Sequence, residues 1–306
     1  MQKKKSPVLR QHAALYMMLL PGALYLFINN YIPMGGMIVA FKQLNFSKGI
    51  LGSPFCGLDN FKFLFSSSQA ALITRNTLLY NLAFIAVNMV VGIAVAIMIT
   101  KITNMKMRKL YQSAILLPFL MSMVILSYIV YALLSTENGM VNNTILKWLH
   151  IDPIQWYQQP KYWPAILIIA NCWKGVGYGC LIYIAAILGI DPAYYEAARL
   201  DGASRWQEIR HITLPCIMPT IITLTLLSVG RIFYSDFGLF YQVPMNSGVL
   251  LPTTNVIDTY VYRALVEQGN ISMSSAAGVY QSLVGFAVVL LCNWLVKRKS
   301  SENALF

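Results

Sequence analysis

The sequence has little charge, since only 11% of its 306 residues are Asp, Glu, Lys or Arg. Soluble domains carry about 25% charged residues, whereas 57% of this chain is hydrophobic and its mean hydropathy is +0.58. The composition excludes an ordinary soluble protein and indicates a chain that crosses a membrane several times. The formal net charge of +12 does not indicate nucleic-acid binding, because most basic residues lie at the ends of apolar runs.

The chain also lacks the motifs of nucleotide-binding and hydrolytic sites. No glycine is followed by lysine, so there is no P-loop, and neither G-x-S-x-G nor H-E-x-x-H occurs. The five cysteines form no C-x-x-C pair, and the three histidines lie at or beyond the edges of apolar runs. We therefore expect no catalytic site, no metal site and no cofactor bound by this chain.

Six apolar runs are long enough to span a membrane, at about 13–41, 76–100, 110–134, 164–189, 216–243 and 274–296. The first run is too long for a signal peptide and has no A-x-A cleavage site, so we expect it to be retained as a span. The prediction is an all-α polytopic membrane protein with six transmembrane helices in a single domain, 1–306.

The basic residues are distributed unevenly between the two sides of this topology. Fourteen Lys and Arg residues lie on the side that holds both ends of the chain, against seven on the other side. Because positive residues accumulate on the cytoplasmic side, we expect both termini and the loop 190–215 to face the cytoplasm.

That loop is the most polar segment of an otherwise apolar chain. Asp191 and Pro192 predict a helix start, and the helix is expected to end before Gly202, which tolerates positive φ. Ser204 and Gln207 then form a capping box that begins a second short helix. Two short helices at an angle predict a rigid projection outside the membrane.

The same residues resemble the EAA loop of ABC importer permeases, in which E-A-A is followed by three residues, G, and then I-x-L-P after a fixed gap. Ile209 stands where that family often has Phe. The resemblance implies contact with an ATPase subunit for Glu196, Ala197, Ala198, Asp201, Gly202, Ala203, Ile212, Leu214 and Pro215.

The resemblance extends over nearly the whole chain and points to the polysaccharide or complex-carbohydrate branch of the maltose-type sugar importers. The motifs that carry it are Tyr31 to Gly36, Ala40 to Lys42, Gly57 to Phe61, Arg75 to Thr77, Leu117-Pro118, Trp173 to Gly177 and Asp258 to Arg263. It implies a type I permease in a bacterial cell membrane that imports a carbohydrate by alternating access. It further implies a second homologous permease, two subunits that bind ATP and Mg, and an extracellular solute-binding lipoprotein.

Three ionisable residues, Lys174, Arg231 and Asp236, fall inside the predicted spans, where charges are costly and usually functional. At about 1.5 Å per residue, Lys174 lies roughly 15 Å, Asp236 roughly 10 Å and Arg231 roughly 18 Å from the outer ends. Lys174 and Asp236 are therefore placed to pair, either as a structural ion pair or as part of a transport path.

Aromatic and amide side chains surround these charges, a combination that suits sugars because rings stack on C–H faces and amides bond hydroxyls. The candidate path residues are Asn171, Trp173, Lys174, Tyr178, Tyr234, Asp236 and Tyr241. Ordinary helix packing by the aromatics is the competing interpretation. Gly175, Gly177 and Gly179 are expected to allow a close helix–helix contact.

Three alternatives to a sugar permease remain open. They are an ABC permease for a different solute, such as a peptide or an amino-sugar polymer, a cation-coupled carrier that uses Lys174 and Asp236, and a membrane enzyme. The EAA-like loop and the lack of an inverted repeat argue against the carrier.

Overall fold

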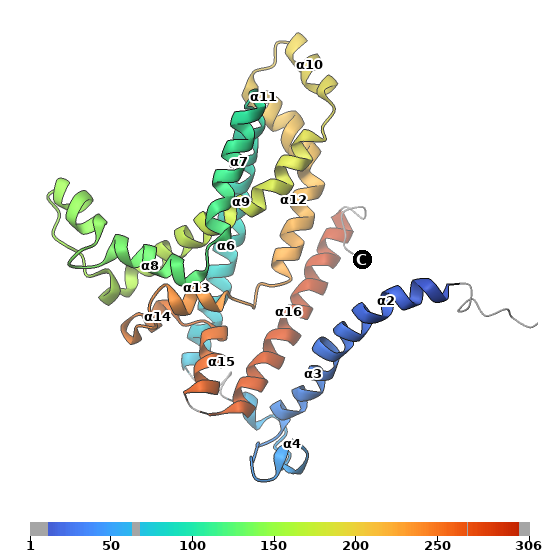
Figure 1. Cartoon of the computed structure of the whole chain (residues 1–306), viewed down its shortest axis with the longest axis vertical. Coiled ribbons are helices and arrows are strands. Elements are labelled where there is room, and N and C mark those ends of the chain that lie inside the picture. Colours follow the sequence, from blue (N-terminus) through green and yellow to red (C-terminus); the bar gives the residue numbers. More distant parts are fainter. Residues whose placement is uncertain (1–11, 63–67, 268, 300–306) are drawn as a thin grey trace, which may run out of the picture.

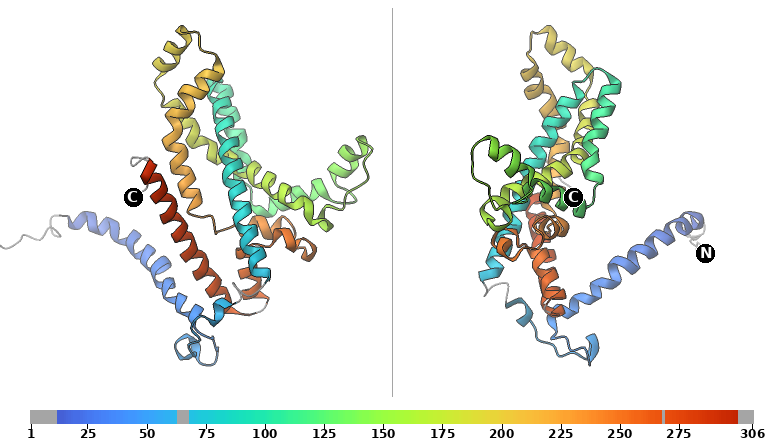
Figure 2. Two further views of the ribbon diagram at one scale, coloured as in Figure 1. Left: turned by 180° about the vertical axis from the view of Figure 1, so that it is seen from behind. Right: turned by 60° about the vertical axis from the view of Figure 1, so that its left-hand side comes forward.

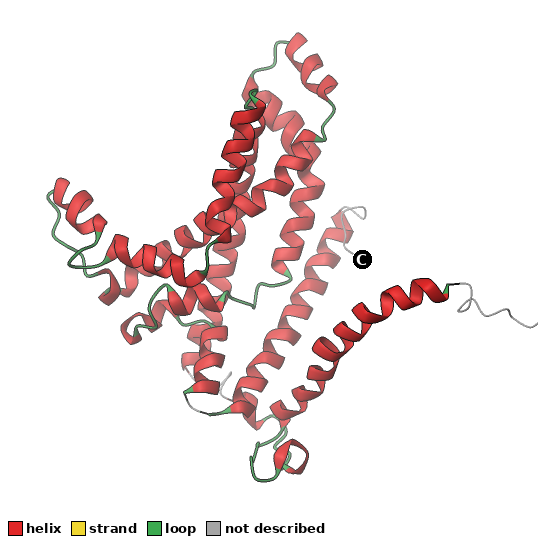
Figure 3. Cartoon of the chain, in the orientation of Figure 1, coloured by secondary structure: helices red, strands yellow, loops and turns green. Residues whose placement is uncertain are grey.

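The computed structural model describes residues 12–62, 68–267 and 269–299. Within these ranges the regular elements are helices, apart from one antiparallel bridge between Lys42 and Phe55 (Figure 3). The all-α prediction is confirmed. Lys3, Lys4, Lys5 and Arg10, which contributed to the predicted orientation, lie outside the described residues.

Five described helices are long and apolar enough to cross a membrane, and a bent pair makes up to six. The five helices are Ala14–Phe41, Gln69–Thr100, Pro160–Leu188, Arg205–Val229 and Ile271–Arg298, and the bent pair is Met105–Leu120 with Met123–Leu134. This count agrees with the six predicted spans. The second helix begins at Ser68, however, well before the predicted start at residue 76.

The centre of the molecule is the long contact between α6 (Ser68–Thr100) and α9 (Trp163–Leu188), which lie side by side (Figures 1 and 2). Helix α7 (Met105–Leu120) approaches α9 so closely that a methyl group on Gly177 would collide with the carbonyl of Ile115. The helix–helix contact predicted for the glycines is thus confirmed at Gly177, whereas Gly175 and Gly179 have open space around them. Small residues at such contacts let helix backbones pack closely in a membrane.

The predicted third span is not one helix, because it bends by 96° between α7 and α8 (Met123–Leu134). Pro118 lies in the last turn of α7, and Met121 is extended. Ser122 then starts α8, since its hydroxyl accepts the amide of Ile125 at 3.2 Å. A proline near a helix end and a serine cap explain the break, which the hydrophobic run alone did not reveal.

The predicted fifth span, 216–243, is also interrupted. Helix α11 (Arg205–Glu208) continues through a π-helical turn into α12 (Leu214–Val229), which ends well before the predicted limit. Residues 230–236 then form turns and extended backbone, and α13 (Phe237–Gln242) follows. The segment 230–236 is called the unwound segment below.

The remaining elements lie outside the central bundle. On the side opposite α10 (Pro192–Leu200) are α4 (Gly49–Gly52), α14 (Leu251–Thr254) and α15 (Ile257–Val266) (Figure 1). The first helical segment, with α2 (Ala13–Leu26) and α3 (Ile32–Met34), stands apart from the bundle in both figures. It packs on α16 (Ile271–Lys299) through Gly35–Phe41, where Val39 and Ala40 are buried.

Candidate functional site

The predicted short helix α10 is confirmed with its cap. The carboxylate of Asp191 accepts the amide of Ala193 at 2.9 Å, and Pro192 occupies the first turn, where no hydrogen bond is lost. The helix ends at Leu200, and Gly202 follows with φ of +79°. Non-glycine residues rarely adopt this conformation, so Gly202 sets the direction in which the chain leaves α10.

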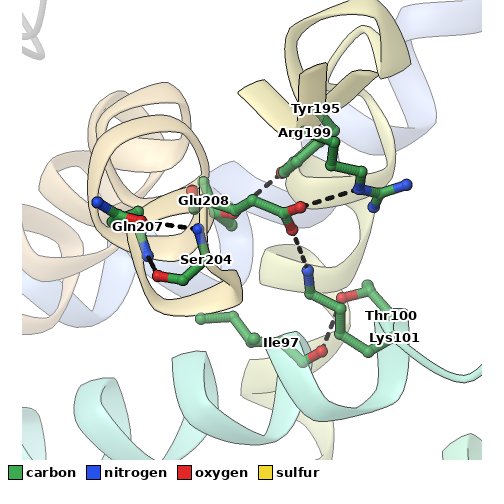
Figure 4. Close-up of polar contacts among 9 residues, drawn as sticks. Ile97, Thr100, Lys101, Tyr195, Arg199, Ser204, Gln207 and Glu208 are labelled. Carbon is green, nitrogen blue, oxygen red and sulfur yellow. Dashed lines mark hydrogen bonds and ion pairs between the residues drawn. The ribbon is translucent and has the colours of Figure 1, made fainter. Parts of the chain in front are cut away.

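The predicted capping box is also confirmed. The amide of Ser204 donates to Oε1 of Gln207 at 2.7 Å, and the amide of Gln207 donates to the Ser204 hydroxyl at 3.4 Å (Figure 4). The second short helix is not separate, however, because α11 runs on into α12. The loop is therefore one free helix, α10, joined by Gly202 to an extension of a spanning helix.

A buried carboxylate ties α10 to the rest of the bundle. Glu208 is 3% exposed, and its two oxygens bind Nζ of Lys101 at 2.8 Å and Nε of Arg199 at 2.9 Å (Figure 4). Arg199 belongs to α10, Lys101 follows the end of α6, and Glu208 precedes α12. We call these three residues the Glu208 clamp.

The Glu208 clamp is supported by a second contact and by its own electrostatics. The hydroxyls of Tyr195 and Thr213 lie 3.0 Å apart, which joins α10 to the π-helical turn before α12. Hydrogen bonds from Lys101 and Arg199 hold the pKa of the Glu208 carboxyl below its ordinary range, so this loop residue is ionised at neutral pH. The clamp therefore connects α10 to both α6 and α12.

The residues that match the EAA pattern lie together on this loop. Glu196, Ala197, Asp201 and Gly202 are exposed, as is Pro215, while Ala198, Ala203, Ile212 and Leu214 are half-buried. Exposed apolar side chains lie among them, with Tyr194 62%, Leu200 89% and Trp206 67% exposed. An apolar projecting surface of this kind is typical of a protein–protein contact. The contact itself stays a prediction for these residues.

A cavity of about 530 Å³ opens between α6, α9, α12 and the unwound segment. Its polar lining comes from Asn81 and Asn88 on α6, Asn171 on α9, Thr225 and Ser228 on α12, and Arg231, Ser235 and Asp236 on the unwound segment. Tyr178 and Tyr234 contribute aromatic rings. Polar groups inside an otherwise apolar bundle indicate a place for a polar solute.

The unwound segment is held by polar side chains from α15 and α16. The amide of Ser235 donates to Oδ2 of Asp258 at 2.7 Å. Gln281 on α16 donates to the carbonyl of Phe233 at 2.8 Å and to Asp258 at 3.2 Å. Burial raises the pKa of the Asp258 carboxyl, and these hydrogen bonds partly offset that rise. Non-helical backbone at membrane depth requires such partners, or a cavity that it lines.

The structure brings together four of the seven predicted path residues. Asn171, Tyr178, Tyr234 and Asp236 line the cavity. Trp173 lies on another face of α9, beside an apolar pocket formed mainly with α8. Tyr241 packs against the rings of Phe237 and Tyr262 at centroid distances of 4.8 and 5.2 Å. The role of these residues in a path stays a prediction.

The predicted ion pair between Lys174 and Asp236 is wrong. Nζ of Lys174 donates to the carbonyls of Phe119 at 3.0 Å and Met121 at 2.6 Å, which are free because α7 ends there. Asp236 instead caps α13 by accepting the amide of Leu239 at 3.2 Å. Lys174 therefore stabilises the bend in the third span, where a cation also suits the helix C-terminus.

Sequence reasoning missed Glu208 and the asparagines of α6. Asn81 and Asn88 are seven residues apart, so they lie on the same face of a helix. Two amide side chains on one face of an apolar span could have predicted that this face lines a polar cavity. Glu208 carried no such signal, because one of its two partners, Lys101, lies 107 residues away in the sequence.

Comparison with known proteins agrees with this architecture. The model of the family described as "Binding-protein-dependent transport system inner membrane component" matches residues 88–301. The chain is similar to the polygalacturonan/rhamnogalacturonan transport system permease protein YteP of Bacillus subtilis (strain 168), with 33% identity over 99% of this chain and 94% of that protein. It is also similar to Protein LplB of the same organism, with 29% identity over 96% and 92%.

The fold is shared with a solved structure of a bacterial ABC transporter involved in the import of the acidic polysaccharide alginate. The TM-score is 0.87 at 34% identity, and the match covers 95% of this chain and 98% of the other. A further structure of the bacterial alginate transporter, in complex with an alginate pentasaccharide-bound periplasmic protein, matches with a TM-score of 0.86 at 34% identity, over 95% of this chain and 96% of the other.

Proposed function

The chain belongs to the family of binding-protein-dependent transport system inner membrane components, and from this premise we propose that it imports an oligosaccharide or a polysaccharide fragment. It is a multi-pass permease subunit and carries no P-loop of its own. The relatives named for polygalacturonan and alginate support a carbohydrate substrate. The observation that carries the mechanism is the Glu208 clamp, which links the projecting helix α10 to the two helices α6 and α12 that line the cavity.

The proposed mechanism is alternating access driven from outside this chain. A partner ATPase subunit grips the exposed face of α10 and moves it when the ATPase dimer closes. Because Glu208 binds Arg199 on one side and Lys101 on the other, a displacement of α10 pulls on the ends of α6 and α12. Both helices contribute side chains to the cavity, so their movement opens it to one side of the membrane or the other.

The partners in this proposal follow from the family and the resemblance. A second homologous permease completes the path, and two ATP-binding subunits hold ATP and Mg and perform the hydrolysis. A solute-binding lipoprotein delivers the carbohydrate from outside; the alginate transporter has been solved with its periplasmic protein, which supports a binding-protein partner here. This chain itself is proposed to bind no cofactor.

In this proposal the chain lies in the bacterial cell membrane. Both termini and α10 face the cytoplasm, as the distribution of basic residues indicates. Single cysteines at Ser47 and Ser204, both exposed, test this orientation in intact cells. We expect an impermeant thiol reagent to label position 47 and not position 204, after subtraction of labelling at native cysteines. Labelling at position 204 would contradict the orientation.

A cation-coupled carrier remains the alternative from another class, but the Lys174–Asp236 pair on which it depended is not formed. Uptake in proteoliposomes separates the two functions. We expect labelled oligosaccharide to enter only when the ATPase subunits, the second permease, the binding protein and ATP are all present. Uptake by this chain alone, driven by an ion gradient, would overturn the proposal.

A further inference from the structure

The cavity contains a cation for which the described residues supply no partner. Of the two basic residues expected within spans, Lys174 is held by two carbonyls. Arg231, on the unwound segment, lines the cavity with an exposed side chain. Among the described residues, no hydrogen bond or ion pair holds its guanidinium; only the backbone bonds to Ser228 and from Tyr234 involve this residue. A guanidinium left open in a cavity is available to an anion.

Asp236 lies in the same cavity but does not neutralise Arg231. No ion pair joins the two residues in the described structure, and the Asp236 carboxylate accepts the amide of Leu239 as the cap of α13. The two charges belong to the same unwound segment, whose Ser235 is fixed by Asp258. One oxygen of the carboxylate is thus held by the local fold, whereas no described residue bonds the guanidinium.

The cavity also holds a fixed amide pair and two aromatic rings. The side-chain nitrogen of Asn88 donates to Oδ1 of Asn171 at 2.9 Å, and both residues line the cavity. The rings of Tyr178 and Tyr234, 55% and 40% exposed, line the same space and suit the C–H faces of a sugar ring.

We propose that this cavity recognises an acidic sugar unit, a uronate, with its carboxylate on Arg231. The inference rests on the proposed function and adds the charge of the substrate to it. Arginine presents two parallel N–H donors that match the two oxygens of a carboxylate. Arg231 is then the residue that distinguishes an acidic oligosaccharide from its neutral counterpart.

The test compares trigalacturonate with its neutral trimethyl ester, with the complete complex in liposomes. Each is supplied at a concentration that saturates the binding protein, as measured by calorimetry on that protein alone. Arg231→Gln removes one charge-assisted contact. We expect trigalacturonate uptake to fall about tenfold, which corresponds to a loss of about 1.4 kcal/mol in binding free energy. Methyl ester uptake stays within about twofold, since an ester makes no ion pair with arginine.

Arg231→Lys and Arg108→Gln are the matched variants. Lysine keeps the charge but not the fork of donors, so we expect intermediate uptake of trigalacturonate. Arg108 lies on α7 and does not line the cavity, so its loss leaves both sugars unaffected. Equilibrium dialysis of trigalacturonate against the purified complex without binding protein gives a second readout, in which Arg231→Gln weakens binding by a similar factor.

Equal loss of both trisaccharides in Arg231→Gln, or loss of neither, would overturn the acidic-sugar inference while leaving a carbohydrate permease intact. Failure of the wild-type complex to import either sugar, although it assembles and hydrolyses ATP, would overturn the proposed function itself. Size-exclusion chromatography of each variant complex separates a transport defect from a failure to assemble.

Discussion

At the scale of single residues, Glu208 shows how a charge is retained in a mostly apolar protein. Its carboxylate is 3% exposed, yet both of its cationic partners reach solvent, with side-chain exposures of 38% and 63%. The partners therefore share little of the cost of burial. Because the pKa of Glu208 is lowered, the stabilisation by the clamp is complete at neutral pH and is lost as the pH falls through that lowered value.

Glu208→Gln is predicted to loosen α10 without unfolding the bundle. The amide keeps the shape but binds two cations poorly, and we expect a cost of about 1–3 kcal/mol, at the lower end because Lys101 and Arg199 can be solvated. Stimulation of ATPase activity by the binding protein should fall several-fold, while basal hydrolysis persists. Glu137→Gln, an exposed acid on the loop after α8, is the control. Unchanged stimulation in Glu208→Gln would remove the clamp from the mechanism.

At the scale of elements, prediction succeeded where the signal was local. The Asp191 cap, the turn at Gly202 and the Ser204 capping box depend on neighbours in sequence, and all three are present. The breaks in the third and fifth spans were missed because hydropathy continues through them. Their stabilising partners, such as Lys174 and Gln281, come from distant helices. Long-range hydrogen bonds of this kind leave no local pattern.

The bent third span gives a prediction of its own. Lys174→Met removes the cation that holds two carbonyls at the end of α7, and we expect a loss of about 1.5–3 kcal/mol. Asp236→Leu removes only the cap of α13, with an expected cost of about 1 kcal/mol. Since the two residues do not pair, the double variant should be additive within about 0.5 kcal/mol. Denaturant unfolding of the purified chain in detergent measures these values, and strong coupling between the two sites would contradict the structure.

At the scale of the whole molecule, the structure connects the projecting helix α10 to the cavity. Helix α10 lies at one end of the bundle (Figure 1). Helices α6 and α12, whose ends meet α10 through the Glu208 clamp, also carry residues that line the cavity. The family, the number of spans and the local structure of the loop 190–215 were predictable from the sequence, because each depends on composition or on a spaced motif. The cavity was predictable only in part, since Arg231 and Asn88 become neighbours of Asn171 through packing.

The central claim is that α10 transmits the work of a separate ATPase to the cavity, and the stimulation of ATP hydrolysis by the binding protein tests it most directly. Gly202→Val strains the positive φ at the end of α10, and Ala198→Leu fills its half-buried face. If either change weakens the docking of α10 on the ATPase subunit by about 1.4 kcal/mol, stimulation falls about tenfold. We expect this loss in both variants, with normal assembly of the complex, whereas Ser47→Val in an exposed loop behaves as wild type. Wild-type stimulation and uptake in both loop variants would contradict the account.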